Sequence, residues 1–120
     1  MRSAMLSVVL VASDVELREA WRRELELDRH AIIVASTAAS GLERLREGGI
    51  DLVLVDLEVA GGIGPLLAGL ERLPDAPPLV LISGKIEAPA LSARVGAAAF
   101  VTKLDALEEL AAVVRRVAAG

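Results

Sequence analysis

Three polar side chains stand where they could do chemistry together. Asp56, Ser83 and Lys103 each come at the end of a short apolar run. A carboxylate nucleophile beside a hydroxyl and an ammonium suits phosphoryl transfer, because that reaction depends on positioning and on neutralising charge around the transferred group. Singly, each residue has a simpler explanation as a turn former or a solvated charge. All three stand at the end of an apolar run, and this shared position favours a functional site.

The apolar runs are expected to be β-strands, because they are short, rich in branched residues and bounded by turn formers. They cover residues 6–12, 31–35, 51–56, 78–83 and 98–103. The run that ends at Asp56 is continuous in Val and Leu, which is typical of a strand buried on both faces.

A helical pattern follows each strand. Ser13 or Asp14 is expected to cap the first helix, which reaches about residue 27 and turns Trp21 toward the core. Further helices are expected after Thr37, near Pro65, over residues 87–95 and from about residue 104.

The last helix carries two further predictions. Asp105 and Glu108 stand at the spacing of a capping box, in which each side chain would bond the other residue's backbone. The apolar period of this helix predicts that Leu107 faces inward, together with Leu110, Ala111, Val114 and Val117.

Strands alternating with helices predict an α/β fold, with one domain over residues 1–120 and helices on both faces of a doubly wound, five-stranded parallel sheet. The carboxyl ends of parallel strands meet at one edge of such a sheet. We therefore expect Asp56, Ser83 and Lys103 to share a crevice there. His30 precedes the second strand, away from that edge, and is expected to be a surface residue.

The composition argues against several classes of protein. A net charge of -4 and an aromatic content of 2% do not suit direct binding of nucleic acid. Without cysteine there is neither a disulfide framework nor a thiolate metal site. No apolar run approaches the ~18 residues of a membrane span, so we expect a cytoplasmic protein without membrane contact.

Over nearly its whole length the sequence resembles the receiver domain of two-component response regulators, the family that includes the chemotaxis regulators. The matching residues are Asp56, Gly64 in the turn after it, the pair Ser83 and Gly84, and the run from Phe100 to Lys103. The resemblance implies a flavodoxin-like sheet with strand order 2-1-3-4-5. It also implies a phosphorelay role, in which a histidine kinase or phosphotransfer protein acts on the domain and an output domain or target protein reads the result.

The resemblance also implies a role for individual residues. Asp56 is similar to the phosphoacceptor, Ser83 to the hydroxyl that contacts the phosphoryl group, and Lys103 to its counter-charge. Ser83 and Phe100 correspond to the switch. The fourth helix, fifth strand and fifth helix correspond to the face that binds partners or a second copy, although their small apolar residues could equally pack the core.

The sequence departs from this family where a magnesium ion would be held. Receivers usually carry an acidic pair after the first strand, and Ala12 and Ser13 stand there instead. Because Mg²⁺ needs several oxygen ligands in near-octahedral geometry, the remaining candidate ligands are Asp56, Glu58 and Asp14. The proline that usually follows the lysine is replaced by Leu104, so a trans peptide bond is expected there.

Two readings stay open from the sequence, and neither is an enzyme. In one, Mg²⁺-dependent phosphorylation of Asp56 is weakened or lost and the domain acts through protein contacts. In the other, the domain is an ordinary phosphorylatable receiver whose metal is held by Asp14, Glu58 and water. A small doubly wound enzyme or nucleotide-binding domain is disfavoured, because the turn after the first strand contains no glycine.

Overall fold

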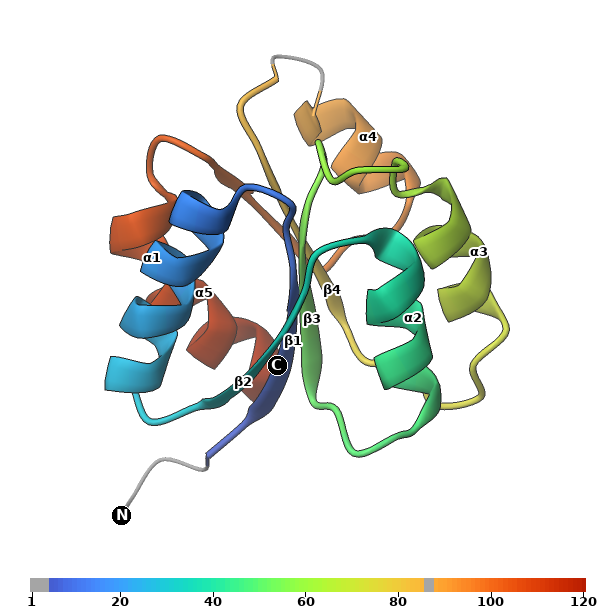
Figure 1. Ribbon diagram of the computed structural model, residues 1–120, viewed down its shortest axis with the longest axis horizontal. Helices are drawn as coiled ribbons and strands as arrows, with labels where there is room; N and C mark the ends of the chain where they lie inside the picture. The colour runs from blue at the N-terminus through green and yellow to red at the C-terminus, as the bar shows by residue number, and fades with distance from the viewer. Residues whose placement is uncertain (1–4, 86–87) are drawn as a thin grey trace.

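The computed structural model describes residues 5–85 and 88–120, which form a parallel sheet between two layers of helices (Figure 1). The strands are β1 (Ser7–Val11), β2 (Ala31–Ala35), β3 (Leu52–Asp56), β4 (Leu79–Ser83) and β5 (Ala99–Thr102). They lie in the order β2-β1-β3-β4-β5, and each strand is parallel to its neighbours. The predicted fold class and strand order are therefore confirmed.

Helices cover both faces of the sheet (Figure 1). The first layer is α1 (Val15–Leu27) with α5 (Ala106–Ala119), and the second is α2 (Ala38–Arg46), α3 (Gly64–Glu71) and α4 (Ala88–Arg94). The predicted start of the fourth helix, Glu87, lies outside the described residues. Every residue of β3 and β4 is buried, as expected for strands covered on both sides.

Alternation along β1 divides the core in two. Val8 and Leu10 pack beneath α1 and α5, whereas Val9 and Val11 pack on the opposite face of the sheet. Trp21 is only 1% exposed in the first of these cores, so its predicted packing role is confirmed. Each fully buried Val or Leu side chain in these cores stabilises the fold by about 1.5–3 kcal/mol. These cores hold the sheet and thereby determine where the strand ends lie.

Asp14, rather than Ser13, caps α1. Its Oδ1 accepts a hydrogen bond from the backbone N–H of Leu17 at 3.1 Å. A cap of this kind stabilises a helix by about 1 kcal/mol. The bond commits the carboxylate of Asp14 to the helix.

The start of α5 differs from the sequence prediction. Asp105 makes no side-chain cap bond, and its Oδ2 instead accepts from the Thr102 hydroxyl at 2.9 Å, so the predicted capping box is wrong. Leu107 is 49% exposed, so its predicted inward position is wrong, whereas Val113 is buried on the inward face. The Thr102 hydroxyl, at the end of β5, binds the carboxylate that was predicted to cap the helix. The spacing of Asp105 and Glu108 alone cannot show this competing hydrogen bond.

His30 is buried, so its predicted surface position is wrong. The ring is held below β1, where Nδ1 accepts from the Leu6 backbone N–H at 3.3 Å and Nε2 lies 3.2 Å from Asp28 Oδ2. Because Nδ1 is the acceptor, the ring proton is on Nε2 and faces the carboxylate. Arg115 on α5 also donates to Asp28 at 2.6 Å. His30 and Asp28 together therefore link the residue before β1 to α5, at the edge opposite the carboxyl ends of the strands.

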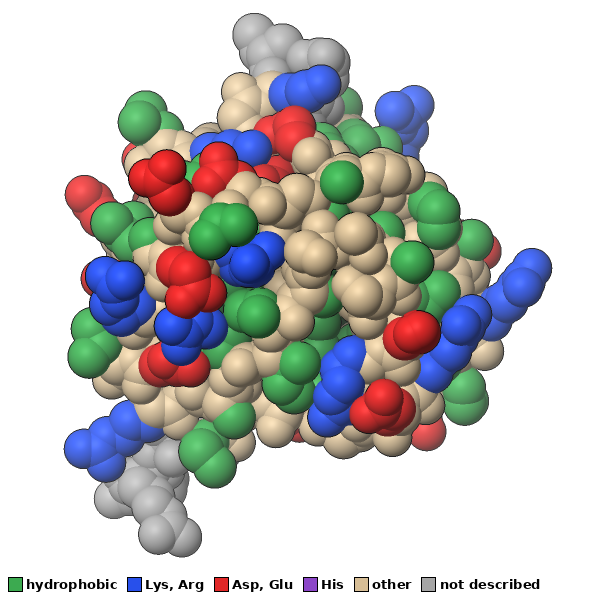
Figure 2. All heavy atoms as spheres, viewed as in Figure 1, with side chains coloured by type: hydrophobic (Ala, Val, Ile, Leu, Met, Phe, Trp, Pro, Cys, Tyr) green, Lys and Arg blue, Asp and Glu red, His purple; other side chains and the backbone are tan. Residues whose placement is uncertain are grey.

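Acidic and basic side chains are interspersed on the outer surface of α1 (Figure 2). Arg22 pairs there with Glu19 and Glu26, which are three and four residues away and therefore on the same side of the helix. Within residues 5–85 and 88–120, none of the helices combines the length and the apolar character that crossing a membrane requires.

Candidate functional site

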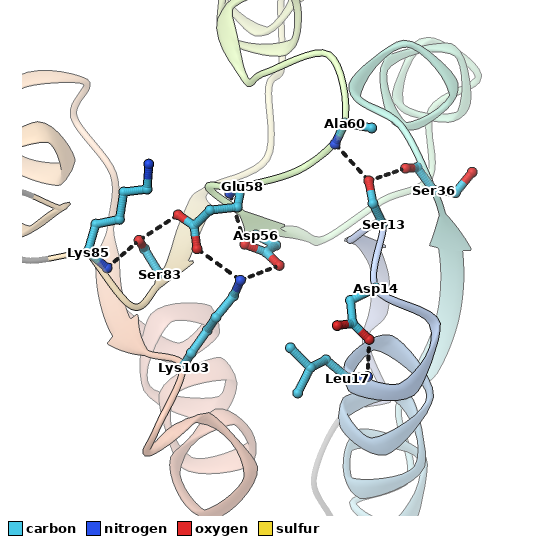
Figure 3. Close-up of polar contacts among 10 residues, drawn as sticks. All are labelled: Ser13, Asp14, Leu17, Ser36, Asp56, Glu58, Ala60, Ser83, Lys85 and Lys103. Carbon is cyan, nitrogen blue, oxygen red and sulfur yellow. Dashed lines mark hydrogen bonds and ion pairs between the residues drawn. The ribbon is translucent and has the colours of Figure 1, made fainter.

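The carboxyl ends of β3, β4 and β5 bring together the three polar residues singled out in the sequence (Figure 3). In the sheet register, Asp56 lies opposite Ile82 on β4, and Ser83 lies opposite Thr102 on β5, the residue before Lys103. Asp56 is 2% exposed and Ser83 is fully buried, whereas the Lys103 side chain is 26% exposed. The three side chains therefore lie together at this edge of the sheet, in a place that we call the crevice, and Lys103 is the most exposed of them.

Lys103 bridges two carboxylates. Its Nζ lies 3.1 Å from Asp56 Oδ2 and 2.9 Å from Glu58 Oε1. Burial alone would lower the pKa of Lys103, but the hydrogen bonds to Glu58 and Asp56 outweigh it and raise the pKa above its usual range. The side chain is thus held as an ammonium.

Glu58 uses both of its oxygens inside the crevice. Oε1 faces Lys103, and Oε2 accepts a hydrogen bond from the Ser83 hydroxyl at 2.8 Å. Burial alone would raise the pKa of Glu58, but the hydrogen bonds from Lys103 and Ser83 lower it overall. Glu58 is therefore a carboxylate anion that lies between the two groups predicted to serve Asp56.

Ser83 is hydrogen-bonded on both sides. Its oxygen accepts from the Lys85 backbone N–H at 3.0 Å while its proton goes to Glu58. Lys85 stands in the connection that leads to α4, so the rotamer of one buried hydroxyl is coupled to the start of that connection.

A tight turn after β3 delivers Glu58 to this position. The Glu58 backbone N–H donates to Asp56 Oδ1 at 2.9 Å, and the Val59 N–H donates to the Asp56 carbonyl at 3.0 Å. Gly61 and Gly62 follow with φ of 87° and 74°, values that favour glycine. The turn folds the chain back so that the side chain of Glu58 points into the crevice (Figure 3).

The end of β1 supports this turn instead of offering carboxylates. The Ser13 hydroxyl donates to the Ser36 carbonyl at 2.8 Å and accepts from the Ala60 N–H at 2.7 Å. Ala12 is fully buried, and its carbonyl accepts from Arg18 Nη1 at 2.9 Å. Both residues at the position of the acidic pair are therefore structural.

Phe100, the residue matched to the switch, is half-buried on β5. It lies opposite Leu81 and packs against the core beneath α2 and α3. Its switch role stays a prediction. Among the described residues no peptide bond is cis, so the bond from Lys103 to Leu104 is trans as expected.

A family model described as the response regulator receiver domain matches residues 8–115. The chain belongs to this family. Its fold, its strand order and the sequence resemblance agree with that assignment. This protein is thus a receiver domain of the two-component response regulators.

One curated relative shares about a quarter of its aligned residues with this receiver. The receiver is 27% identical over 111 residues to YkoG of Bacillus subtilis, an uncharacterized transcriptional regulatory protein. The match covers 90% of this chain and 49% of YkoG, so the chain spans about half the length of that relative.

Solved structures share the fold of this receiver. A signal receiver domain described as that of NarL from Mycobacterium tuberculosis is 25% identical, with a TM-score of 0.84 and coverage of 98% of this chain and 99% of the other. The receiver domain of NtrX from Brucella abortus is 24% identical, with a TM-score of 0.82 and coverage of 93% and 98%.

Receiver domains typically bind Mg²⁺ in an acidic pocket, and the donors of this receiver do not fit that ion as they are arranged. Asp56 faces Lys103, Glu58 is engaged by Lys103 and Ser83, and Asp14 is turned to the first turn of α1 (Figure 3). In the part of the chain that the structure describes, no group of three or more His, Cys, Asp or Glu could hold a metal ion. Mg²⁺ is usually held by one or two carboxylates and several waters, so these carboxylates would first have to leave their present partners.

From the sequence, Glu58 was predicted only as a candidate metal ligand. Its contacts with Lys103 and Ser83 were not predicted. One signal was available: a residue two positions after a strand-end aspartate can reach back over that strand when the turn is tight. Whether it points inward depends on Ser13 and Ala60, which are 47 positions apart in the sequence.

Proposed function

We propose that this receiver is a divergent signalling module in which Mg²⁺-dependent phosphorylation of Asp56 is weakened or lost, and which works through protein contacts. The observation that supports it is the double engagement of Glu58 by Lys103 and Ser83, at 2.9 and 2.8 Å. A phosphoryl group on Asp56 would need the same ammonium and hydroxyl to balance its charge. In this proposal Asp56 keeps the place of the phosphoacceptor, and Ser83 and Phe100 keep that of the switch.

A second candidate is an ordinary phosphorylatable receiver. It is favoured by the pair of Asp56 and Lys103, whose 3.1 Å separation keeps a nucleophilic carboxylate beside a neutralising cation. In this reading Asp14, Glu58 and water would hold the metal. Asp14 would then have to leave Leu17, and Glu58 would have to leave Lys103, so a helix cap and a charge-assisted hydrogen bond count against it.

The partners in either case are those of a phosphorelay. A histidine kinase or phosphotransfer protein would act at the crevice, and an output domain or target protein would bind the face formed by α4, β5 and α5. On that face Ala90 and Ala98 are exposed and Leu91 is half-buried, so small apolar groups are available to a partner or a second copy.

Phosphorylation with acetyl phosphate separates the two candidates. The receiver is incubated with acetyl phosphate and Mg²⁺, and the intact mass is followed over time, with Asp56→Asn as the control. We expect little phosphoryl mass on the parent protein. Stoichiometric modification that disappears in Asp56→Asn would overturn the proposal and support the ordinary receiver.

A further inference from the structure

We propose that the carboxylate of Glu58 is a resident anion, which occupies the place of a phosphoryl group and holds Ser83 and Lys103 in their anion-bound arrangement without phosphorylation. The inference rests on the proposed function and deepens it, since it gives the receiver a signalling state of its own.

The two carboxylate oxygens of Glu58 bind different partners. One contacts the ammonium of Lys103 at 2.9 Å and the other accepts the Ser83 hydroxyl at 2.8 Å. A phosphoryl oxygen on Asp56 would seek those same two donors, because they are a cation and a hydroxyl at the ends of the neighbouring strands. One carboxylate therefore meets the hydrogen-bonding demand that a phosphoryl group would otherwise meet.

The crevice already contains two negative charges and one positive charge. Asp56 and Glu58 already share the single ammonium of Lys103. A phosphoryl group would bring a further charge of roughly −1.5 to −2 to the same crevice. Like charges held this close repel, so Glu58 disfavours a second anion as well as replacing it.

Hydrogen bonds hold the turn that carries Glu58 in place. The backbone of Glu58 is tied to Asp56 Oδ1, and the next turn is tied to β1 through Ala60 N–H and the Ser13 hydroxyl at 2.7 Å. Thr37 and Ala60 also form an isolated parallel bridge, which joins the turn to the start of α2. Because the backbone of this turn is already ordered, only the side-chain freedom of Glu58 is lost when its carboxylate enters the crevice. Ser13, which stands in place of an acidic residue, is thus a positioning residue for Glu58.

The consequence is carried by Ser83. Its hydroxyl is held toward the crevice by Glu58, and the Lys85 N–H donates to its oxygen at 3.0 Å. In this way the anion fixes the beginning of the connection between β4 and α4. The α4 and β5 face would then present one conformation to a partner, whatever the state of Asp56.

The amide of Lys85 provides a direct test. We compare its nuclear magnetic resonance shift in the parent, Glu58→Ala and Glu58→Gln, in buffer with a metal chelator, and then titrate each with inorganic phosphate. Glu43→Ala is the control, because Glu43 is an exposed carboxylate on α2. Glu58→Gln keeps the shape of the side chain and serves if Glu58→Ala fails to fold.

We expect Glu58→Ala to move the Lys85 resonance, and phosphate to return it toward its parent position. Phosphate should bind Glu58→Ala roughly tenfold or more tightly than the parent, since a hydrogen bond to a charged group is worth that much. Glu58→Gln should show the same effect in smaller degree, and Glu43→Ala should match the parent. An unmoved resonance, or no recovery in either Glu58 variant, would overturn the inference. This result is independent of acetyl phosphate reactivity, so the resident anion and the proposed function can fail separately.

Discussion

Ser83 donates its hydroxyl proton to Glu58 at 2.8 Å, across 25 positions of the sequence. The bond joins the end of β4 to the turn after β3, and it turns an expected phosphoryl-binding hydroxyl toward a carboxylate of the same chain. Several experiments depend on this relationship and on the ion pairs around it.

Removal of the ammonium should destabilise the site. In Lys103→Met, Asp56 would be left nearly buried beside Glu58 without a cation, and we expect a loss of about 1–3 kcal/mol in the free energy of unfolding. Urea denaturation measures it. The exposed Lys85→Met is the control, and addition of Asp56→Asn should recover part of the loss. A Lys103→Met variant as stable as the parent would contradict the importance of the bridge.

Acid should weaken the Glu58 contacts. Because the pKa of Glu58 is lowered in the folded state, its contribution to stability is present above its usual pKa of about 4.3 and is lost as the pH falls through the lower, folded value. Between about pH 6 and about pH 3, the parent should therefore lose more stability than Glu58→Gln. Urea midpoints across this range measure the difference, and Glu43→Gln serves as the exposed comparison. Parallel curves for the parent and Glu58→Gln would contradict it.

An acidic residue at position 13 should create affinity for magnesium. In Ser13→Asp combined with Glu58→Ala, a carboxylate enters at the end of β1 and Asp56 is relieved of a neighbouring anion. We expect Mg²⁺ binding in calorimetry that neither the parent nor Glu58→Ala shows, since carboxylate oxygens are the ligands this ion prefers. Equal binding by the parent would instead support the ordinary receiver.

Substitution of the buried His30 should lower the stability of the fold without affecting the crevice. His30→Ala removes the acceptor of the Leu6 N–H and leaves Asp28 with Arg115 only, so we expect a loss of about 1–3 kcal/mol in the free energy of unfolding. His30→Asn retains an acceptor near Nδ1 and should lose less. Thermal or urea unfolding gives the values. The phosphate titration of Glu58→Ala should be unchanged by either substitution, because His30 lies at the opposite edge of the sheet.

The local pattern of the sequence predicted the strands and a parallel sheet, and the resemblance to receiver domains supplied the strand order. The continuous apolar run before Asp56 predicted a doubly covered strand, and β3 is buried throughout. Once the strands are parallel, their carboxyl ends must share an edge, which is why Asp56, Ser83 and Lys103 could be placed together. The choice between Ser13 and Asp14 as the cap of α1 could not be made in the same way, because both residues have a side-chain oxygen that could accept the bond.

The amino-acid sequence alone therefore predicted the parallel sheet and the groups that meet at one of its edges, from the period of apolar residues and a few strand-end positions. Its resemblance to receiver domains indicated the family. Only the tertiary structure decided what those groups bond to. Glu58 turns inward because Ser13 and Ala60 close the turn above it, and His30 is buried because Leu6 and Asp28 converge on its ring. Such contacts join residues far apart in the chain, and the free energy that selects them arises only when the folded strands bring their polar atoms within hydrogen-bonding distance.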